Sequence, residues 1–501
     1  MVRGVVLRLK VITENIQTGN PSIAVLNKVD SDKLDLFAGD RINVSTKNKQ
    51  VICIVDIGYS SRNSPQGHIA LFQESINKLN VKDNSIVSVE IAKRPESINI
   101  IKKKLSGAQL SKKEYRKIVE EIVNDNLSDI ELTYFVAACS AHNLTMREIK
   151  HLIDAIVGTG LIIKPKSKIV VDKHCVGGVA GNRTTMIVTP IVAAAGYTVP
   201  KTSSRAITSP SGTANTMECL SDVSLSEKRI INVVNKVGAC MVWGGALNLA
   251  PADDKIIRIE HPLSIDVSGL LLSSIISKKI SVSSTHLLID IPWGKGSKFT
   301  SKKEALSLKR KFEMITKASG IKCKVVLTDG RSPIGQGLGP VLEAIDVMKV
   351  LQNEEGAPRD LRNKSIMLAG YLFELIGRSK KGKGKILAKQ LLDDGSALKK
   401  MDEIIDAQGR VPMPEIGKYK KVVFAYKSGK IVRIDNFLFS KLAKISGAPK
   451  SKGAGVYLNI NLGQRIKKNA ILLTIYSDSM VKLKFATRFY DNNKKDFLLI
   501  K

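Results

Sequence analysis

The 501-residue sequence predicts a multidomain α/β protein, because three different hydrophobic patterns follow one another along the chain. Short β-branched runs separated by turn residues come first, helix-face spacing comes second, and strands alternating with helices come third. A chain of this length also exceeds what one hydrophobic core usually supports. We therefore expect several domains, each with its own core.

The first domain is predicted to be a small β-rich domain covering residues 1–86. Apolar and β-branched residues form short runs there, for example Val5–Val11 and Val51–Val55. Alternation with a period of two places one face of each run in a core. Turn residues such as Gly39 separate the runs, so we expect a barrel-like module.

An α-helical subdomain is predicted for residues 87–168. Apolar residues recur there at the three- and four-residue spacing of a helix face. Ser128 followed by Glu131 is the pattern of a helix N-cap with an acidic first turn. We expect Gly158 and Gly160 to end the last helix, and residues 262–285 to pack on this subdomain.

A central mixed α/β sheet domain is expected for residues 169–261 and 286–407. Strands are predicted at the following positions: 169–171, 287–292 and 323–328. Each is followed by a helical pattern, and strands that alternate with helices favour a largely parallel sheet covered by helices. Short strands return near residue 408, so residues 408–501 are predicted to form a C-terminal α+β, barrel-like domain.

The chain carries a large excess of basic residues. Lys and Arg number 79 against 46 Asp and Glu, a formal net charge of +33. Such an excess attracts anions, so nucleic acid, an anionic membrane surface and phosphorylated metabolites are candidate partners. Aromatic residues make up only 5% of the chain, and no basic stripe has aromatics between its cations. We expect small anionic substrates, with neither nucleic acid nor membrane as a partner.

The cysteines and the N-terminal residues favour a cytoplasmic protein. Six cysteines occur at irregular spacing and none forms a C-x-x-C pair, so zinc and iron–sulfur sites are not expected. Free thiols fit a reducing compartment. The first residues lack the apolar block of a signal peptide, and no run reaches the length of a membrane-spanning helix. We expect neither a metal nor another cofactor.

A glycine-rich turn after the first strand of the central domain is the strongest candidate for anion binding. Lys173 and His174 lie at the end of that strand, and Gly177, Gly178 and Gly181 follow before a helix. Glycines let backbone N–H groups approach an anion, and a helix N-terminus adds partial positive charge. The spacing is neither that of a P-loop nor that of a dinucleotide fingerprint, which disfavours ATP and NAD. The alternative interpretation is a tight structural turn whose lysine reaches solvent.

A hydroxyl-rich run supplies further donors for phosphate oxygens. Residues 201–213 directly follow a strand-like stretch at 197–199 and contain seven Ser and Thr hydroxyls together with Arg205, a combination that suits phosphate. Two weaker signals follow: Asp266 precedes a helix that carries Ser274, and Lys298 lies in a second glycine-rich turn. The structural alternatives are a polar surface loop for the hydroxyl-rich run and a helix N-cap for Asp266.

Taken together, these motifs resemble the thymidine/pyrimidine nucleoside phosphorylase family. The residues that carry the resemblance form three groups: Asp172-Lys173-His174 with Gly177-Gly178, Ser203-Ser204-Arg205 with Gly212-Thr213, and Leu327-Thr328-Asp329 with Pro333-Ile334-Gly335 and Gly339. The resemblance covers about four fifths of the chain and implies a nucleoside phosphorylase/phosphoribosyltransferase-like fold. It is closest to the archaeal-type branch, which carries an extra N-terminal domain and acts on nucleoside 5′-monophosphates.

The resemblance implies a reaction and a set of contacts. The reaction is phosphorolysis of AMP to adenine and ribose 1,5-bisphosphate, with CMP and UMP as further substrates and inorganic phosphate as co-substrate. Asp266 falls at the family's acid position and would protonate the leaving base, with His174 as the alternative proton source. The substrate contacts that carry over are Gly178, Ser204, Arg205, Ala206, Ile207, Thr208, Ser209, Thr213, Ser274 and Lys298, with Lys173 as a further phosphate ligand. Ser274 and Lys278 fall where the family has a Ser and a Lys that contact the base. Members of the family assemble as homodimers, and we expect a homodimer or a larger homo-oligomer.

Three rival functions stay open at this point. A thymidine or uridine phosphorylase would share the motifs, and a nucleic-acid-binding protein would use the high positive charge. A phosphoribosyltransferase of the anthranilate type would need magnesium and pyrophosphate-binding acidic residues, and the loops offer no matching acidic pair. Two residues also depart from the expected pattern: Cys175 stands in place of Ser, and Asn215 in place of Asp.

Overall fold

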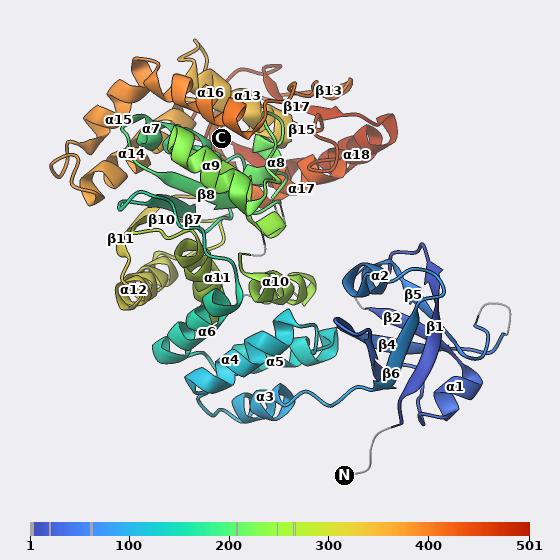
Figure 1. Ribbon diagram of the computed structural model, residues 1–501. Helices are drawn as coiled ribbons and strands as arrows, with labels where there is room; N and C mark the ends of the chain where they lie inside the picture. Colours follow the sequence, from blue (N-terminus) through green and yellow to red (C-terminus); the bar gives the residue numbers. More distant parts are fainter. Residues whose placement is uncertain are drawn as a thin grey trace. The chain divides into compact units, whose positions relative to one another are not determined.

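The computed structural model describes residues 5–19, 22–60, 64–206, 209–247, 249–263, 265 and 267–501 (Figure 1). The chain divides into two compact units. The first unit comprises Met1–His142 with Arg258–Leu263, and the second comprises Asn143–Ile257 with Ser264–Lys501. No helix among the described residues combines the length and the apolar character that crossing a membrane requires.

The first unit begins with a closed β-barrel. Its elements are β1 (Leu7–Glu14), β2 (Ile23–Asn27), α1 (Lys28–Asp32), β3 (Arg41–Ser45), β4 (Gln50–Gly58), β5 (His68–Phe72), α2 (Gln73–Leu79) and β6 (Ile86–Ile91). The strands follow the order β1-β5-β2-β4-β3-β6 around the barrel. Alternate residues fill the interior, as Ile42 and Val44 of β3 and Cys53 and Val55 of β4 illustrate. The predicted barrel-like module is therefore confirmed.

Helices follow the barrel, and three of them begin with a reciprocal cap. They are α3 (Ser97–Leu105), α4 (Lys112–Val123) and α5 (Asp129–Ala141) in the first unit and α6 (Met146–Thr159) in the second. The predicted cap of α5 is confirmed, because the Ser128 hydroxyl accepts the Glu131 N–H while the Glu131 carboxylate accepts the Ser128 N–H. The prediction for the end of α6 is half right: Gly160 caps the helix, whereas Gly158 lies inside its last turn.

The central part of the second unit is an α/β structure, although Arg258–Leu263, the end of one of its helices, belong to the first unit. Its elements are β7 (Val171–Cys175), α7 (Thr184–Ala194), β8 (Val199–Ser203), α8 (Thr213–Met217), α9 (Glu227–Val237), β9 (Ala239–Trp243), the 3₁₀ turn η1 (Gly244–Leu247), α10 (Pro251–Leu263), α11 (Ser268–Ser281), β10 (His286–Trp293), α12 (Lys302–Ala318), β11 (Lys322–Asp329), α13 (Pro340–Leu351), α14 (Arg359–Leu375), α15 (Gly384–Asp393) and α16 (Ser396–Gln408). Strands β11-β10-β7 pair in parallel, as do β8 and β9. A parallel bridge between Val170 and Thr198 links the two sets, which confirms the predicted parallel sheet.

Two strands lie further along the chain than predicted. β7 spans Val171–Cys175 rather than 169–171, and Lys201 belongs to β8 rather than to the hydroxyl-rich loop. Both shifts have one physical reason. Asp172 and Lys201 are buried polar residues in strands, and each has an ion-pair partner from another element. A search for apolar residues therefore does not recognise these positions as part of a strand.

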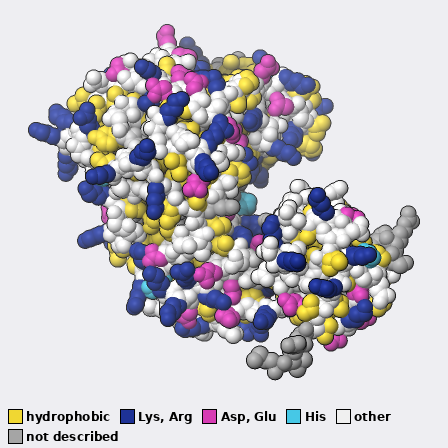
Figure 2. All heavy atoms as spheres, in the orientation of Figure 1, with side chains coloured by type: hydrophobic (Ala, Val, Ile, Leu, Met, Phe, Trp, Pro, Cys, Tyr) yellow, Lys and Arg dark blue, Asp and Glu magenta, His cyan; other side chains and the backbone are white. Residues whose placement is uncertain are grey.

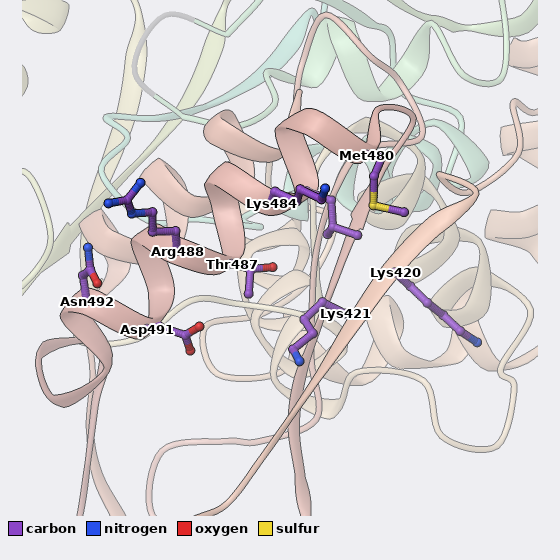
Figure 3. Close-up of a pocket in the computed structure, with 9 residues that line it drawn as sticks. Lys420, Lys421, Met480, Lys484, Thr487, Arg488, Asp491 and Asn492 are labelled. Atoms are coloured by element: carbon purple, nitrogen blue, oxygen red, sulfur yellow. The ribbon is translucent and has the colours of Figure 1, made fainter.

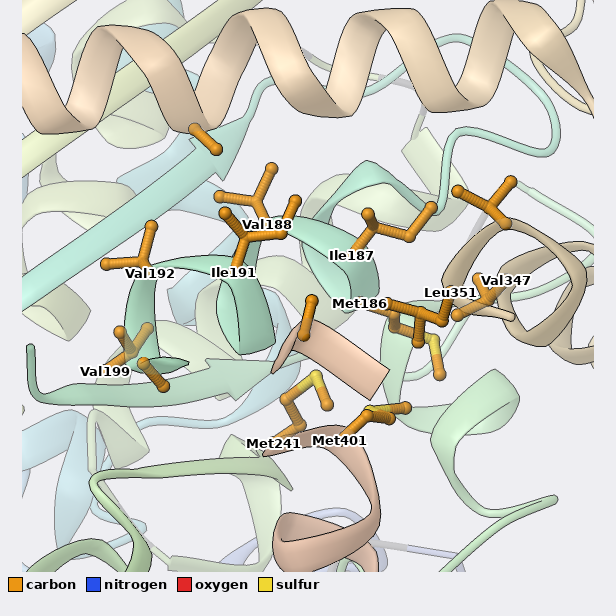
Figure 4. Close-up of a cluster of buried hydrophobic side chains, with 14 of the residues drawn as sticks. Met186, Ile187, Val188, Ile191, Val192, Val199, Met241, Val347, Leu351 and Met401 are labelled. Atoms are coloured by element: carbon orange, nitrogen blue, oxygen red, sulfur yellow. The ribbon is translucent and has the colours of Figure 1, made fainter. Parts of the chain in front are cut away.

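The helix that follows the glycine turn lies in the main core of the second unit. α7 is buried along its whole length and packs against α13, α14, α15 and α16. Met186, Ile187 and Ile191 of α7 join Met241 of β9 in one apolar cluster (Figure 4). Complete burial of such a side chain contributes about 1.5–3 kcal/mol to stability. This packing fixes the position of the α7 N-terminus, where the glycine turn ends.

The C-terminal part is α+β, as predicted, but its strands form two separate sheets. Its elements are β12 (Gly337–Leu338), β13 (Tyr419–Phe424), β14 (Gly429–Ile434), α17 (Asn436–Ser446), β15 (Gly455–Leu458), β16 (Arg465–Ile466), β17 (Ile471–Ser477), α18 (Met480–Phe497) and β18 (Leu498–Ile500). The sheets have the orders β12-β15-β17-β13 and β16-β14-β18. The first sheet takes in β12 from the predicted central domain, which a pattern confined to residues 408–501 does not reveal. The domain boundaries given above stay predictions.

Candidate active site

Lys173 is a buried cation near the carboxyl end of β7. Only 2% of the residue is exposed, and its Nζ donates to the hydroxyls of Thr184 at 2.8 Å and Thr185 at 3.4 Å. Both hydroxyls belong to the first turn of α7. Within the described residues Lys173 forms no salt bridge. Burial, aided by the charges of nearby Lys364 and Arg183, lowers its pKa although the Asp290 carboxylate acts in the opposite direction, so a bound anion would stabilise the ammonium form.

The structure brings the turn that holds Gly178 against the turn that holds Lys298. Gly177 and Gly178 have φ values of +93° and +86°, which favour glycine. A Cβ on Gly178 would lie 2.3 Å from the backbone N of Lys298 and 2.9 Å from its Cβ. Two of the predicted contact residues therefore meet through their backbones at the carboxyl ends of β7 and β10, where parallel sheets hold ligands.

Replacing Gly178 with alanine is expected to displace the Lys298 turn. The new Cβ would overlap backbone atoms, which cannot rotate aside, so we expect the KM for phosphate, the predicted co-substrate, to rise about tenfold or more. Gly177→Ala is the matched control, because it has the same strained φ but nothing within 4 Å of the added Cβ. Steady-state kinetics with phosphate as the varied substrate compare the two variants. Equal effects would show that only backbone strain matters.

Arg183 anchors the hydroxyl-rich run to the start of α7. Its NH1 donates to the Thr213 hydroxyl at 3.1 Å, and its NH2 donates to the carbonyl oxygen of Ser211 at 2.8 Å. The Glu343 carboxylate pairs with the same guanidinium group. Ser209 in turn donates to the Ser211 carbonyl at 2.7 Å. Predicted contacts Ser209 and Thr213 are thus held near the helix N-terminus that also holds Lys173.

Asn215 keeps the preceding loop in shape. Its Oδ1 accepts the backbone N–H of Ala206 at 2.6 Å and that of Gly212 at 3.1 Å. A carboxylate oxygen of the expected Asp would accept the same kind of bond. Asn215 therefore makes the two bonds that Asp would make at this position. Ser204, an exposed residue, packs its backbone closely on Gly212. The predicted contacts Ile207 and Thr208 lie outside the described residues.

Arg205 is engaged by a carboxylate and a ring. Its guanidinium lies 3.9 Å from the ring centroid of Trp243, and its Nε donates to the Glu218 carboxylate at 3.1 Å. The side chain is 44% exposed. Neither contact involves Lys173 or Lys298. The predicted role of Arg205 in phosphate binding stays a prediction, and it requires that Glu218 share or release the guanidinium.

Ser274 and Lys278, the predicted base contacts, lie on the face of α11 that meets α10. Ser274 donates to Asp253 Oδ2 at 2.7 Å, and the Nζ of Lys278 is 2.7 Å from the same oxygen. Lys278 also lies 3.4 Å from Asp254. Burial lowers the pKa of Lys278, but the two carboxylates outweigh it and raise the pKa above its ordinary value. The lysine is therefore charged, and the acidic pair in the first turn of α10 is a part of the site that the sequence did not indicate.

Asp172 and His174 form the opposite face of β7. Asp172 is fully buried, and its carboxylate is 3.2 Å from the Nζ of Lys201 and 2.6 Å from the Nζ of Lys279. Burial alone would raise the pKa of Asp172, but the two ammonium groups lower it. Burial and the same two lysines hold the pKa of His174 well below its ordinary value. His174 is therefore neutral at neutral pH, which favours Asp266 over it as the proton donor.

Asp266 and Cys175 are the remaining residues that the sequence singled out. Asp266 lies outside the described residues, so its role as the acid stays a prediction. The Cys175 Sγ accepts a hydrogen bond from Asn182 Nδ2 at 3.2 Å, and burial raises the pKa of the Cys175 thiol. A protonated, half-buried thiol is a poor nucleophile. Cys175 therefore has a structural place beside the glycine turn.

Sequence reasoning missed several residues that the fold brings to this region. They are Arg183, Thr184, Thr185, Lys201 and Lys279. A signal exists for two of them, since Thr184 and Thr185 directly follow the glycine turn at the start of a helix. Lys201 and Lys279 carry no such local signal, because their shared partner Asp172 is far away in the sequence.

The remaining positive charge does not gather at one point. Lys and Arg side chains are scattered over the visible face of the molecule (Figure 2). A cavity of about 500 Å³ lies between β13 and α18 and includes Lys420, Lys421, Lys484 and Arg488, but none of the candidate site residues. Figure 3 shows these cationic side chains extending in different directions. Among the described residues, no group of three His, Cys, Asp or Glu side chains is placed to hold a metal ion.

Comparison with known proteins gives consistent matches. Residues 98–160 match the helical bundle domain of the glycosyl transferase family, and residues 167–398 match its a/b domain. A protein of Rhodopseudomonas palustris named "Putative thymidine phosphorylase" is 43% identical, over 92% of this chain and 90% of its own. The AMP phosphorylase of Methanocaldococcus jannaschii is 42% identical over 96% of both chains. The anthranilate phosphoribosyltransferase structure from Thermus thermophilus matches with a TM-score of 0.52 at 17% identity, over 62% of this chain and 98% of its own, which shows a shared fold.

Proposed function

This chain belongs to the glycosyl transferase family whose helical bundle and a/b domains it contains, and on that premise we propose that it phosphorolyses nucleoside 5′-monophosphates. It is an enzyme of the pentosyltransferase class, a phosphorylase, as its relatives are. With AMP, inorganic phosphate yields adenine and ribose 1,5-bisphosphate. The thymidine phosphorylase relative supports the alternative, a pyrimidine nucleoside as substrate.

The observation that carries the proposal is the state of Lys173. A buried ammonium group is costly unless an opposite charge compensates it. Lys201 and Lys279 share the carboxylate of Asp172, and Lys364 pairs with that of Asp290, whereas Lys173 is held only by hydroxyls among the described residues. Inorganic phosphate would supply the missing negative charge. The α7 N-terminus, to which the Gly178 turn leads, lies beside Lys173, so backbone N–H groups there are available to the same anion.

The proposed chemistry follows from two requirements of N-glycosidic cleavage. A phosphate oxygen forms the new bond to C1 of the ribose while the bond from C1 to the base nitrogen breaks, and positive charge develops at C1. Lys173 and the glycine turn hold the phosphate against C1, which replaces a bimolecular encounter with a local one. Asp266 gives its proton to the leaving nitrogen, so that the base departs neutral rather than as an anion.

A nucleotide brings a second anion, the 5′-phosphate. Lys298 lies on the turn that contacts Gly178, and the hydroxyls of Ser209 and Thr213 belong to the loop anchored by Arg183. These groups offer donors beyond those that one phosphate needs. They support a nucleotide rather than a nucleoside as substrate.

We expect AMP to be turned over with a kcat/KM at least about 100-fold above that of adenosine, because charge-assisted hydrogen bonds contribute about 1.5–3 kcal/mol each. Adenosine is the matched control, since it differs from AMP only by the 5′-phosphate. Base release with phosphate is measured for AMP, CMP, UMP, adenosine and thymidine. Turnover of thymidine without turnover of AMP would reject the nucleotide proposal and establish the alternative.

A further inference from the structure

One buried carboxylate joins three elements of the candidate site. Asp172 of β7 has no exposed surface and lies between Lys201 of β8 and Lys279 of α11, whose side chains are 6% and 3% exposed. Its Oδ1 also accepts the backbone N–H of Lys173 at 2.7 Å. The sheet pairing does not require any of these contacts, because β7 and β8 are linked by the bridge between Val170 and Thr198.

Each joined element carries a different part of the site. β7 carries Lys173, the proposed ligand of inorganic phosphate. β8 leads into the hydroxyl-rich run that holds Ser209 and Thr213. α11 carries Ser274 and Lys278, the predicted base contacts, and Lys278 directly precedes Lys279. A shift of one element against another would move phosphate, sugar and base groups relative to each other.

Stability alone does not account for such a cluster. Desolvation of buried ions offsets much of their attraction, and apolar side chains of the same size often stabilise a protein as well or better. Two ammonium groups around one carboxylate also leave a surplus positive charge. Burial lowers the pKa of Lys279, and the charge of the second lysine lowers it further. The cluster does fix how the two lysine side chains are oriented, because each oxygen of Asp172 contacts a different lysine.

We propose that Asp172 is a positioning residue whose two lysine partners control different steps of substrate recognition. Through Lys279 it holds α11 so that Ser274 and Lys278 meet the base, and through Lys201 it holds β8 so that the hydroxyl-rich run meets the phosphates. This inference rests on the proposed phosphorolysis of nucleotides, which it extends to the residues that set base selectivity.

The test compares Lys279→Met with Lys201→Met. Both substitutions remove one buried lysine from the same carboxylate and leave the other lysine beside it. We expect Lys279→Met to bring the kcat/KM values for AMP and UMP closer together by about 10- to 100-fold, because misplacement of about 1 Å has effects of that size. We expect Lys201→Met to raise the KM for phosphate while leaving the AMP-to-UMP ratio unchanged.

Hydrogen exchange gives a readout that does not depend on activity. Lys279→Met should increase amide exchange in α11, and Lys201→Met should increase it in β8 and the following loop. Asp30→Asn is the control for general destabilisation, since Asp30 is a buried, ion-paired carboxylate of the barrel. An unchanged AMP-to-UMP ratio in Lys279→Met, or the same exchange pattern in both lysine variants, overturns the proposal. Wild-type protein that splits no nucleotide would reject the proposed function instead, and the exchange patterns would still decide the inference.

Discussion

Lys173→Met is expected to lower kcat/KM for phosphate by about 10²–10³-fold, the effect of removing one preorganised charge-stabilising donor from an active site. Methionine keeps the volume of the buried side chain but has no charge and no donor. The hydroxyls of Thr184 and Thr185 would lose the ammonium that they hold. The KM for phosphate should rise more than the KM for AMP, which initial rates over a grid of both substrates resolve.

Two further variants separate anion binding from folding. Thr184→Val keeps the shape of the residue and removes the nearer hydroxyl partner of Lys173, so a smaller effect in the same direction is expected. Lys324→Met is the fold control, because Lys324 pairs with Glu374 and lies over the ring of Tyr371, away from the glycine turn. Phosphate kinetics that fall as far in Lys324→Met as in Lys173→Met would remove Lys173 from the proposed site.

The general fold was predictable wherever one local pattern decides it. Alternation within Val51–Val55 predicts a barrel strand, and the side chains of Val51, Cys53 and Val55 fill the barrel. The spacing of Ser128 and Glu131 predicts a capped helix, and the reciprocal bonds are present. In each case the residues that carry the signal are within a few positions of the groups that they bind, so a short window contains the whole interaction.

The strands of the site were misplaced because their stabilising partners are distant in the sequence. Asp172 contacts Lys279, which lies 107 positions further along the chain. A short window therefore contains a polar residue with no partner, and such a residue is typical of a turn. The same limit applies to Arg205, whose contact with the ring of Trp243 depends on how β8 and β9 pair. Long-range ion pairs are the feature that the sequence pattern does not contain.

The contact between Gly178 and Lys298 was predictable only in part. Both follow strands, β7 and β10, and these strands pair in parallel. Parallel neighbours bring their carboxyl ends to one edge of the sheet, so two glycine-rich turns after such strands are expected to lie together. The sequence pattern does not reveal how close the two backbones come. They are so close that no side chain fits at Gly178.

Asp266→Asn is expected to lower kcat for AMP by about 10²–10⁴-fold, the usual contribution of a positioned general acid. Asparagine is close to aspartic acid in size but has no carboxyl proton to give, so adenine would leave as an anion. Binding of AMP should change little, because the proton is needed in the transition state rather than in the ground state. Rapid-quench kinetics and equilibrium binding of AMP without phosphate measure the two quantities separately.

A substrate that needs no acid distinguishes proton donation from positioning by Asp266. In 7-methylguanosine 5′-monophosphate the base carries a fixed positive charge and departs neutral without protonation. The Asp266→Asn variant should therefore approach wild-type turnover with this substrate while it remains impaired with AMP. Equal losses with both substrates would mean that Asp266 orients the substrate rather than protonating the base. The neutral state of His174 then leaves solvent as the proton source.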